Sequence, residues 1–233
     1  MKHAENSPER TWIIMIIIGE KINGAIPSIK KAIAEHDEAL IVERTLAQAK
    51  AGADFLDCAP STATDIEYET MVWLIGLMQG VTQTPLCIDS PNAKLLARIL
   101  EEGHVARPGM VNSVNEEGDK CETIFPLIAG SDWNVLTCDR DGIPADPEKK
   151  IDIAKRIIDK ADKYGVAMNQ LHIDPCVMAI ATMPTSMKDF ERCIRGIHEY
   201  APTVKVTGAI SNISFDMPAR KYVNMNCMAY AIE

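Results

Sequence analysis

Short apolar runs alternate along the chain with longer segments in which apolar residues recur at helical spacing. The apolar runs predict seven strands, at residues 13–18, 54–59, 86–89, 109–114, 134–138, 171–174 and 204–210. The amphipathic segments between and after them predict helices at residues 29–35, 38–50, 64–79, 91–102, 123–129, 146–164, 186–200 and 218–233. A regular strand–helix alternation is typical of a parallel α/β fold.

Seven such units favour a TIM-type (β/α) barrel over an open doubly wound sheet, which stays open as the alternative. No linker-like stretch divides the chain, so residues 15–233 are interpreted as one domain and residues 1–14 as an N-terminal extension. The run "WIIMIII" (12–18) follows a leader that contains Glu5 and Glu9 and precedes "GEKIN", which is no cleavage site. It therefore predicts a buried strand and neither a signal peptide nor a membrane span.

Several residues predict helix boundaries. Thr64-x-x-Glu67 matches a capping box, and Ser90 before Pro91 matches an N-cap followed by a first-turn proline. Asp146-Pro147 predicts another helix start. Glycines predict helix ends, at positions 52, 80, 103 and 165.

Charge and cysteine usage narrow the function classes. The net charge is −9 and basic residues are dispersed, which disfavours nucleic acid or an anionic membrane as partner. The seven cysteines form no C-x-x-C pair, which indicates reduced thiols in a cytoplasmic protein without a structural zinc site. Neither G-x-G-x-x-G nor G-x-x-x-x-G-K-[ST] occurs, so dinucleotide and phosphate-loop sites are not expected.

Carboxylates and amides follow nearly every predicted strand, where a barrel places its catalytic groups. These strand-end residues are Glu20 to Asn23, Asp57, Asp89 to Asn92, Asn112-Ser113, Asp139, Asp174-Pro175 and Ser211-Asn212. Some have structural alternatives: Ser90 as a helix cap, Asp174 as a turn former before proline, Asn212 as a turn residue. As a set they suit a flat, donor-rich heterocycle, because a carboxylate accepts two N–H bonds from a guanidine-like edge. A reduced pterin fits this description, although composition alone does not name it.

Specific motifs strengthen that interpretation. The segments "IIIGEKING", "LDCAPST", "CIDSPN", "VNSV", "LHIDP" and "GAISNISFDMPAR" resemble the pterin-binding barrel family, in particular its methyltetrahydrofolate:corrinoid methyltransferases. The resemblance extends from about Ile16 to Glu233. Two positions depart from the family pattern, since Asp216 and Ala209 stand where glycine is common.

The resemblance implies roles for individual residues. Asp89, Asn112 and Asp174 would hold the pterin, with Asp57 as a further polar group of the pocket. In the S-N-x-S-F motif, Ser211 would contribute to the site and Asn212 would contact the ring near N5 as the catalytic group. Arg220 would also contact the substrate, with a solvated helix residue as its structural alternative.

The resemblance also implies a fold and an activity. The fold would be a (β/α)8 barrel whose last strand–helix unit is lacking in this chain. The activity would be methyl transfer between N5 of tetrahydrofolate and the cobalt of a corrinoid, in either direction. Because the corrinoid-binding pattern D-x-H-x-x-G is lacking, the cobalamin is expected on a partner protein. A homodimer and anaerobic one-carbon metabolism are further expectations. A dihydropteroate synthase-like enzyme and a non-catalytic pterin-binding subunit stay open as alternatives.

Overall fold

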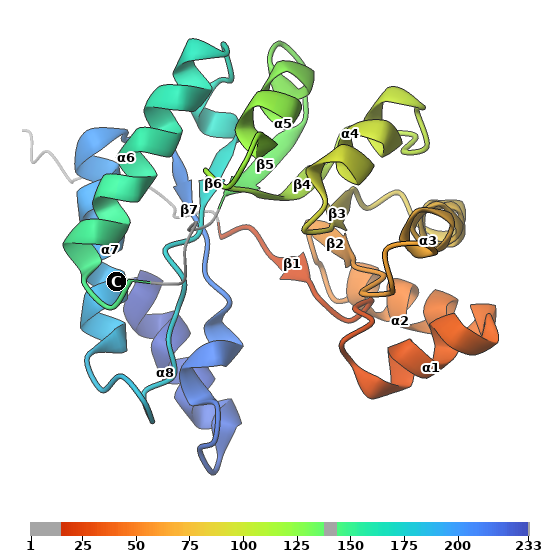
Figure 1. Ribbon diagram of the computed structural model, residues 1–233. Helices are drawn as coiled ribbons and strands as arrows, with labels where there is room; N and C mark the ends of the chain where they lie inside the picture. Colours follow the sequence, from red (N-terminus) through yellow and green to blue (C-terminus); the bar gives the residue numbers. More distant parts are fainter. Residues whose placement is uncertain (1–14, 138–143, 233) are drawn as a thin grey trace, which may run out of the picture.

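A parallel sheet of seven strands forms the centre of the computed structural model, which describes residues 15–137 and 144–232 (Figure 1). The strands lie in chain order, and each pairs in parallel with the next. Their bounds are β1 Ile18–Gly19, β2 Phe55–Cys58, β3 Leu86–Asp89, β4 Met110–Val114, β5 Asn134–Thr137, β6 Leu171–Ile173 and β7 Lys205–Val206.

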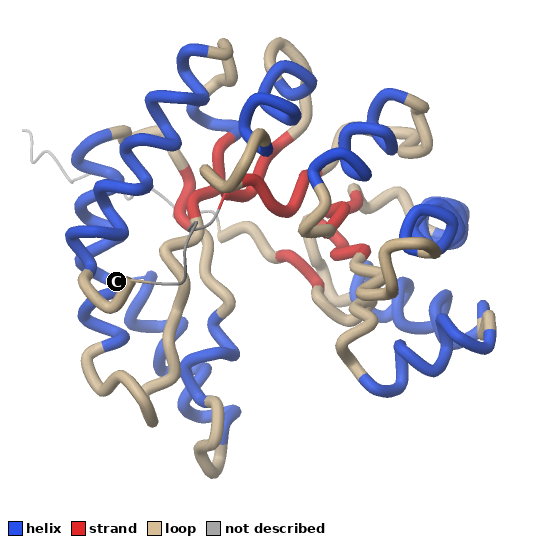
Figure 2. The backbone as a smooth tube through the Cα atoms, viewed as in Figure 1, coloured by secondary structure: helices blue, strands red, loops and turns tan. Residues whose placement is uncertain are grey.

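Helices follow every strand. They are α1 Pro27–Glu35, α2 Glu38–Lys50, α3 Glu67–Val81, α4 Ala93–Glu101, α5 Lys120–Ile128, α6 Pro147–Lys163, α7 Ser186–Tyr200 and α8 Arg220–Ile232, with short 3-10 turns η1 Met168–Gln170 and η2 Ile210–Ser214. Figure 2 shows the strands gathered at the centre with helices arranged around them. The sequential strand order confirms the barrel-type prediction over the doubly wound alternative: the seven strands form a half-barrel.

The core lies between the sheet and its helices. Strand residues such as Leu56, Ile88 and Val111 have no exposed surface, and they belong to the same buried cluster as Leu96 and Phe125 of the helices. Burying each such side chain contributes about 1.5–3 kcal/mol. This packing, together with the parallel register, fixes where each strand ends and therefore where its last polar residue lies.

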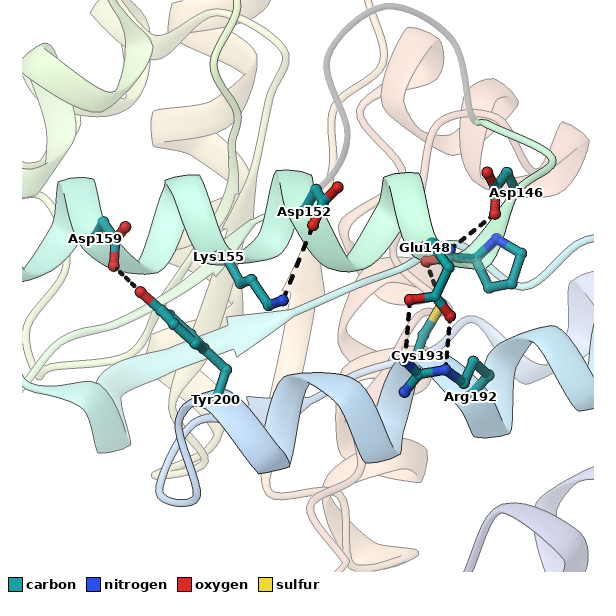
Figure 3. Close-up of polar contacts among 9 residues, drawn as sticks. Asp146, Glu148, Asp152, Lys155, Asp159, Arg192, Cys193 and Tyr200 are labelled. Carbon is teal, nitrogen blue, oxygen red and sulfur yellow. Dashed lines mark hydrogen bonds and ion pairs between the residues drawn. The ribbon is translucent and has the colours of Figure 1, made fainter.

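Helices α6 and α7 are joined by polar contacts along their length (Figure 3). Arg192 donates two hydrogen bonds to the Glu148 carboxylate, at 2.7 and 2.9 Å. At the other end Tyr200 donates to Asp159. Asp146 caps α6 by accepting from the backbone N–H of Glu148 at 3.0 Å, as predicted. The amino end of α6 is thereby fixed both by its own cap and by α7.

Two predicted helix starts are wrong. α3 begins at Glu67 after Ile66 and has no side-chain cap, because the Glu67 carboxylate accepts a 2.6 Å bond from the Ser90 hydroxyl instead of closing a capping box with Thr64. α4 is capped by Asn92, which accepts from the Leu95 N–H at 3.3 Å.

Other predicted boundaries also shift. Gly80 lies inside α3 and does not end it, since the helix continues to Val81. The glycines at 52, 103 and 165 do adopt the left-handed φ expected just beyond a helix. The helix predicted at 123–129 begins three residues earlier, at Lys120.

The two edge strands are shorter than predicted. β1 starts only at Ile18, and Met15 and Ile17 are 42% and 44% exposed, so the predicted buried strand is wrong over these residues. Within the described residues β1 has a partner only on the β2 side, which leaves its start uncovered. The rest of that prediction, and the 1–14 extension, lie outside the described residues. β7 ends at Val206, and residues 207–209 lead without regular structure into η2, which begins at the predicted strand end, Ile210.

Candidate functional site

Three of the predicted site residues lie side by side on neighbouring strands. Asp57 on β2 pairs in register with Cys87 on β3, and Asp89 at the end of β3 pairs with Asn112 on β4. Because all three strands are parallel, these side chains come to the same end of the sheet. The structure therefore brings together Asp57, Asp89 and Asn112 as the sequence predicts.

Asp57 is the most deeply buried carboxylate of the group, with 2% of its surface exposed. Burial raises its pKa well above the ordinary value, the charges of Asp89 and Glu20 raise it further, and hydrogen bonding from Cys87 and Asn112 opposes the rise. Among the described residues its Oδ1 atom has no hydrogen-bond partner. An unpaired buried acceptor carries a desolvation cost, so Asp57 is suited to receive a donor from a ligand.

Asp89 is partly exposed and titrates close to neutrality. Burial, followed by the charges of Glu20 and Glu67, raises its pKa to about 6. Glu67 is held beside it by the Ser90 hydroxyl. Asp89 is thus surrounded by negative charge, and a ligand that is cationic or rich in hydrogen-bond donors would stabilise its ionised form.

Asp174 lies just beyond β6, on a strand that does not neighbour the first three. Its Oδ1 accepts a 2.8 Å hydrogen bond from the Cys176 N–H. Burial raises its pKa to about 6, Glu20 adds to the rise, and the Cys176 hydrogen bond and the Lys150 charge oppose it. The turn alternative is correct for this backbone contact, which is made by Oδ1 and not by Oδ2.

Glu20 is a strand-end residue to which the sequence assigns no individual role in the site. It follows β1, and its charge raises the pKa of Asp57, Asp89 and Asp174 alike. Its own pKa is raised by desolvation against the charge of Lys21. Its position after a strand is the signal that could have identified it. We call Glu20, Asp57, Asp89 and Asp174 the acidic cluster. The charge of Glu20 couples Asp174 to the two aspartates on β2 and β3.

Ser211 and Asn212 lie in the 3-10 turn η2 and not on a strand. The Asn212 N–H donates to Ala209 and its carbonyl accepts from Phe215, at 2.9 and 3.2 Å. Its partly exposed side-chain amide forms no hydrogen bond with any described residue, which leaves it available to a ligand. The turn is joined to the loop after β6 by the Ile180 N–H, which donates to the Ile213 carbonyl at 3.0 Å.

Arg220 holds this turn. Its Nη2 donates to the Ser211 carbonyl and its Nε to the Ser214 hydroxyl, both at 2.9 Å, and its guanidinium lies 5.0 Å from the centre of the Phe215 ring. Arg220 is exposed, yet it is a structural contact of the turn and not simply a solvated helix residue. Asp216, where the resemblance leads us to expect glycine, adopts a left-handed φ of 60°, a conformation that Asp tolerates better than most residues.

His172 is placed away from these strand ends. It is buried, and its Nε2 lies 3.2 Å from the Asn134 side chain at the start of β5. Burial, with the Lys205 charge, lowers its pKa to about 3, so it is neutral at physiological pH. Asp139 lies outside the described residues.

Two other kinds of feature, a metal-binding cluster and a membrane-spanning helix, were considered for the described residues. Residues 15–137 and 144–232 bring together no group of three or more His, Cys, Asp or Glu side chains that would hold a metal ion. No helix in those ranges is both long and apolar enough to cross a membrane.

Comparison with known proteins agrees with this geometry. Residues 25–233 match the family model described as pterin binding enzyme. The chain is 45% identical over 222 residues to a methylcorrinoid:tetrahydrofolate methyltransferase of Eubacterium limosum, covering 94% of this chain and 81% of that protein. It is 31% identical to a methionine synthase of Mycobacterium leprae, covering 90% of this chain but 18% of that protein.

Solved structures show the same fold. A dihydropteroate synthase of Stenotrophomonas maltophilia superposes with a TM-score of 0.65 at 16% identity, covering 93% of this chain and 83% of the other. One of Burkholderia cenocepacia gives 0.65 at 13% identity, covering 95% and 82%. At these identities the likeness concerns the fold alone. The family match and the 45% identical relative carry the assignment: the chain belongs to the pterin-binding enzyme family.

Proposed function

We propose that this protein transfers a methyl group between N5 of tetrahydrofolate and the cobalt of a corrinoid carried by a partner protein. The observation that carries the proposal is the 45% identity, over 94% of this chain, to a protein named for methyl transfer between a methylcorrinoid and tetrahydrofolate. The acidic cluster supports it from the side of the chemistry.

The cluster fits a reduced pterin. A 2-amino-4-oxo pterin edge presents N–H donors to carboxylates and an acceptor to an amide, which matches Asp89, Asp174 and Asn112. The unpaired Oδ1 of Asp57 supplies a further acceptor in the same group of strands. Like charges held this closely destabilise the empty site, so donors from the ligand are more favourable here than in water.

Methyl transfer from an unprotonated N5 would have to expel an amide anion, which is a poor leaving group, whereas a protonated N5 leaves as a neutral amine. Protonation or strong hydrogen bonding at N5 supplies the better leaving group, and an interaction that strengthens in the transition state raises the rate. We assign this hydrogen bond to the side-chain amide of Asn212. Asp89 and Asp174, with pKa values raised to about 6 by burial, can each change protonation state near neutral pH.

The corrinoid would supply a cobalt centre that accepts or donates the methyl group. This chain's own task is to bind and orient the pterin and to stabilise the proton at N5.

A dihydropteroate synthase activity is the second candidate, on the basis of fold. That chemistry needs a lysine near the end of the seventh strand. Lys205 lies on β7, but its ammonium donates to the Asn169 carbonyl at 2.7 Å and lies beside His172, away from the strand ends. The geometry therefore favours methyl transfer.

The test uses the purified chain, 5-methyltetrahydrofolate and free cob(I)alamin, with the cobalt spectrum as readout. We expect conversion to methylcob(III)alamin that depends on the protein. Formation of dihydropteroate from a pterin diphosphate and aminobenzoate, without methyl transfer, would establish the second candidate. Pterin binding with neither reaction would show a non-catalytic subunit.

A further inference from the structure

Lys150 is a buried cation that the proposed chemistry does not use. It lies in the first turn of α6 and is 6% exposed, whereas its neighbour Lys149 is exposed. Lysine is almost never buried this far without a partner. Its ammonium donates to the Cys176 carbonyl at 2.9 Å, a contact between residues 26 positions apart.

The contact with Cys176 connects Lys150 to Asp174 of the proposed site. Cys176 adopts a left-handed φ of 60°, and its N–H donates to the Asp174 carboxylate at 2.8 Å. Lys150 therefore binds one side of the residue whose other side binds Asp174. A loop residue in an uncommon conformation needs such contacts to stay in place.

Lys150 and Asp174 also face the same small cavity, of about 10 Å3, which Thr137 lines with them. That is close to the room one water molecule needs. Thr137 is fully buried, and its hydroxyl has no hydrogen-bond partner among the described residues. Lys150, Asp174 and Thr137 therefore line one cavity of about the size of a water molecule.

The rest of α6 keeps the ammonium there. Asp146 caps the helix start and Glu148 is bound by Arg192 of α7, so the turn that carries Lys150 is held on both sides (Figure 3). A cation on a fixed helix acts as a pre-placed charge, whereas a surface lysine would move with solvent.

We propose that Lys150 is a positioning residue of the pterin site, which holds the 174–176 loop and keeps Asp174 available as a carboxylate. The expected effect on tetrahydrofolate binding rests on the proposed function, whereas the expected effect of Lys150 on the pKa of Asp174 does not. Burial and Glu20 raise the pKa of Asp174, and the Lys150 charge opposes them. Loss of the ammonium raises that pKa further, so that less of Asp174 is ionised at neutral pH to accept the ligand's N–H donors.

The test compares Lys150→Met with the control Lys149→Met. In the unliganded protein, the carboxyl 13C signal of Asp174, assigned with Asp174→Asn, is titrated. We expect Lys150→Met to raise the midpoint by about one pH unit, from about 6 to about 7, and so to weaken tetrahydrofolate binding by about twofold at pH 7 and by about tenfold at pH 5. In an Asp174→Asn background the same substitution is expected to change binding far less, because coupled residues are not additive.

The result of each measurement either supports or contradicts the proposed role of Lys150. An unchanged Asp174 midpoint in folded Lys150→Met, or an equal change in Lys149→Met, would overturn the proposal. If Lys150→Met does not fold, Lys150→Gln keeps a donor without the charge and is expected to raise the midpoint too. A wild-type protein that binds no tetrahydrofolate would refute the proposed function, while the titration still tests Lys150.

Discussion

The ends of β2 to β4 and the turn after β7 contribute to the same proposed site in different ways. At the first, Asp57, Asp89 and Asn112 stand on paired strands, and register and burial fix their backbone. At the second, Asn212 stands in a 3-10 turn after a two-residue strand, and Arg220 supplies much of what holds it.

The difference indicates that the two regions have separate roles, one in binding the ligand and one in the reaction. Strand-borne carboxylates are pre-organised before any ligand arrives and are suited to ground-state binding of a flat ring. A turn-borne amide without a hydrogen-bond partner in the described residues has a free donor and acceptor for a group that appears during reaction. We therefore expect substitutions at the strand ends to change affinity, and substitutions in the turn to change rate.

The largest effect is expected from Asn212→Ala. If its amide stabilises protonated N5, methyl transfer slows by roughly 10²-fold or more, the scale seen when one transition-state donor is removed. Binding of 5-methyltetrahydrofolate should weaken much less than the rate falls. Single-turnover methyl transfer, followed by the cobalt spectrum, and a binding titration on the same preparation measure both.

Asn226→Ala is the matched control, because Asn226 is an exposed amide on α8 that donates only to its own helix, at Tyr222. Unaltered turnover in Asn212→Ala would return Asn212 to a simple turn residue. A loss of about 1 kcal/mol in stability with normal chemistry is what that alternative predicts.

At the other region, Asp89→Asn should chiefly weaken binding. The amide accepts one hydrogen bond where the carboxylate accepts two, and we expect tetrahydrofolate affinity to fall by about 10- to 100-fold, as for loss of a charge-assisted hydrogen bond. A folate without the 2-amino group should bind wild type and Asp89→Asn with similar affinity. Asp65→Asn, at an exposed aspartate, is the control. Equal affinity of wild type for both folates would contradict the Asp89 and Asp174 assignment.

The accuracy of the sequence-based predictions also differs between these two regions. The short apolar runs predicted β2 to β6 to within one residue at each end but the edge strands β1 and β7 only in part. The strand ends located Asp57, Asp89, Asn112 and Asp174, because register follows from burial. The strand before Asn212 ends at Val206, four residues earlier than predicted, since nothing in the apolar run "VKVTGAI" marks where pairing with β6 stops. Asn212 therefore lies in a turn, the alternative that the sequence left open. Contacts between distant residues were not predictable: Glu67 bonds Ser90 and not its own helix, and Lys150 reaches Cys176.

A smaller effect, again on rate, is expected from Arg220→Ala. The substitution removes two hydrogen bonds that hold η2, to Ser211 and Ser214, so the turn explores more conformations and Asn212 is less often in place. We expect turnover to fall by about tenfold, with affinity nearly unchanged, since misplacement of a catalytic group costs rate before binding. Lys221→Ala, at the exposed neighbour, is the control. A change in affinity as large as the change in rate would instead place Arg220 on the substrate.

The smallest effect concerns the stability of the empty protein. The pKa of Asp89 is raised from 3.8 to about 6 on folding, so the unfolded chain releases this proton first and stability falls as pH rises from about 4 to 6. Asp89→Asn has no charge to be desolvated or to repel Glu20 and Glu67. It should therefore be more stable than wild type by about 1 kcal/mol at pH 7.5, less than the full shift implies because Asp89 is partly exposed and solvent screens these charges.

Near pH 4 the wild-type acid is already protonated in the folded state, and the difference between the two proteins should nearly vanish. Urea unfolding at several pH values measures both ends, with Asp65→Asn showing no such trend. A gain of equal size at every pH would mean that the substitution acts through packing and not through charge. A gain confined to neutral pH, combined with weaker folate binding, would show that the strand-end carboxylates lower stability in order to bind the ligand, as functional sites commonly do.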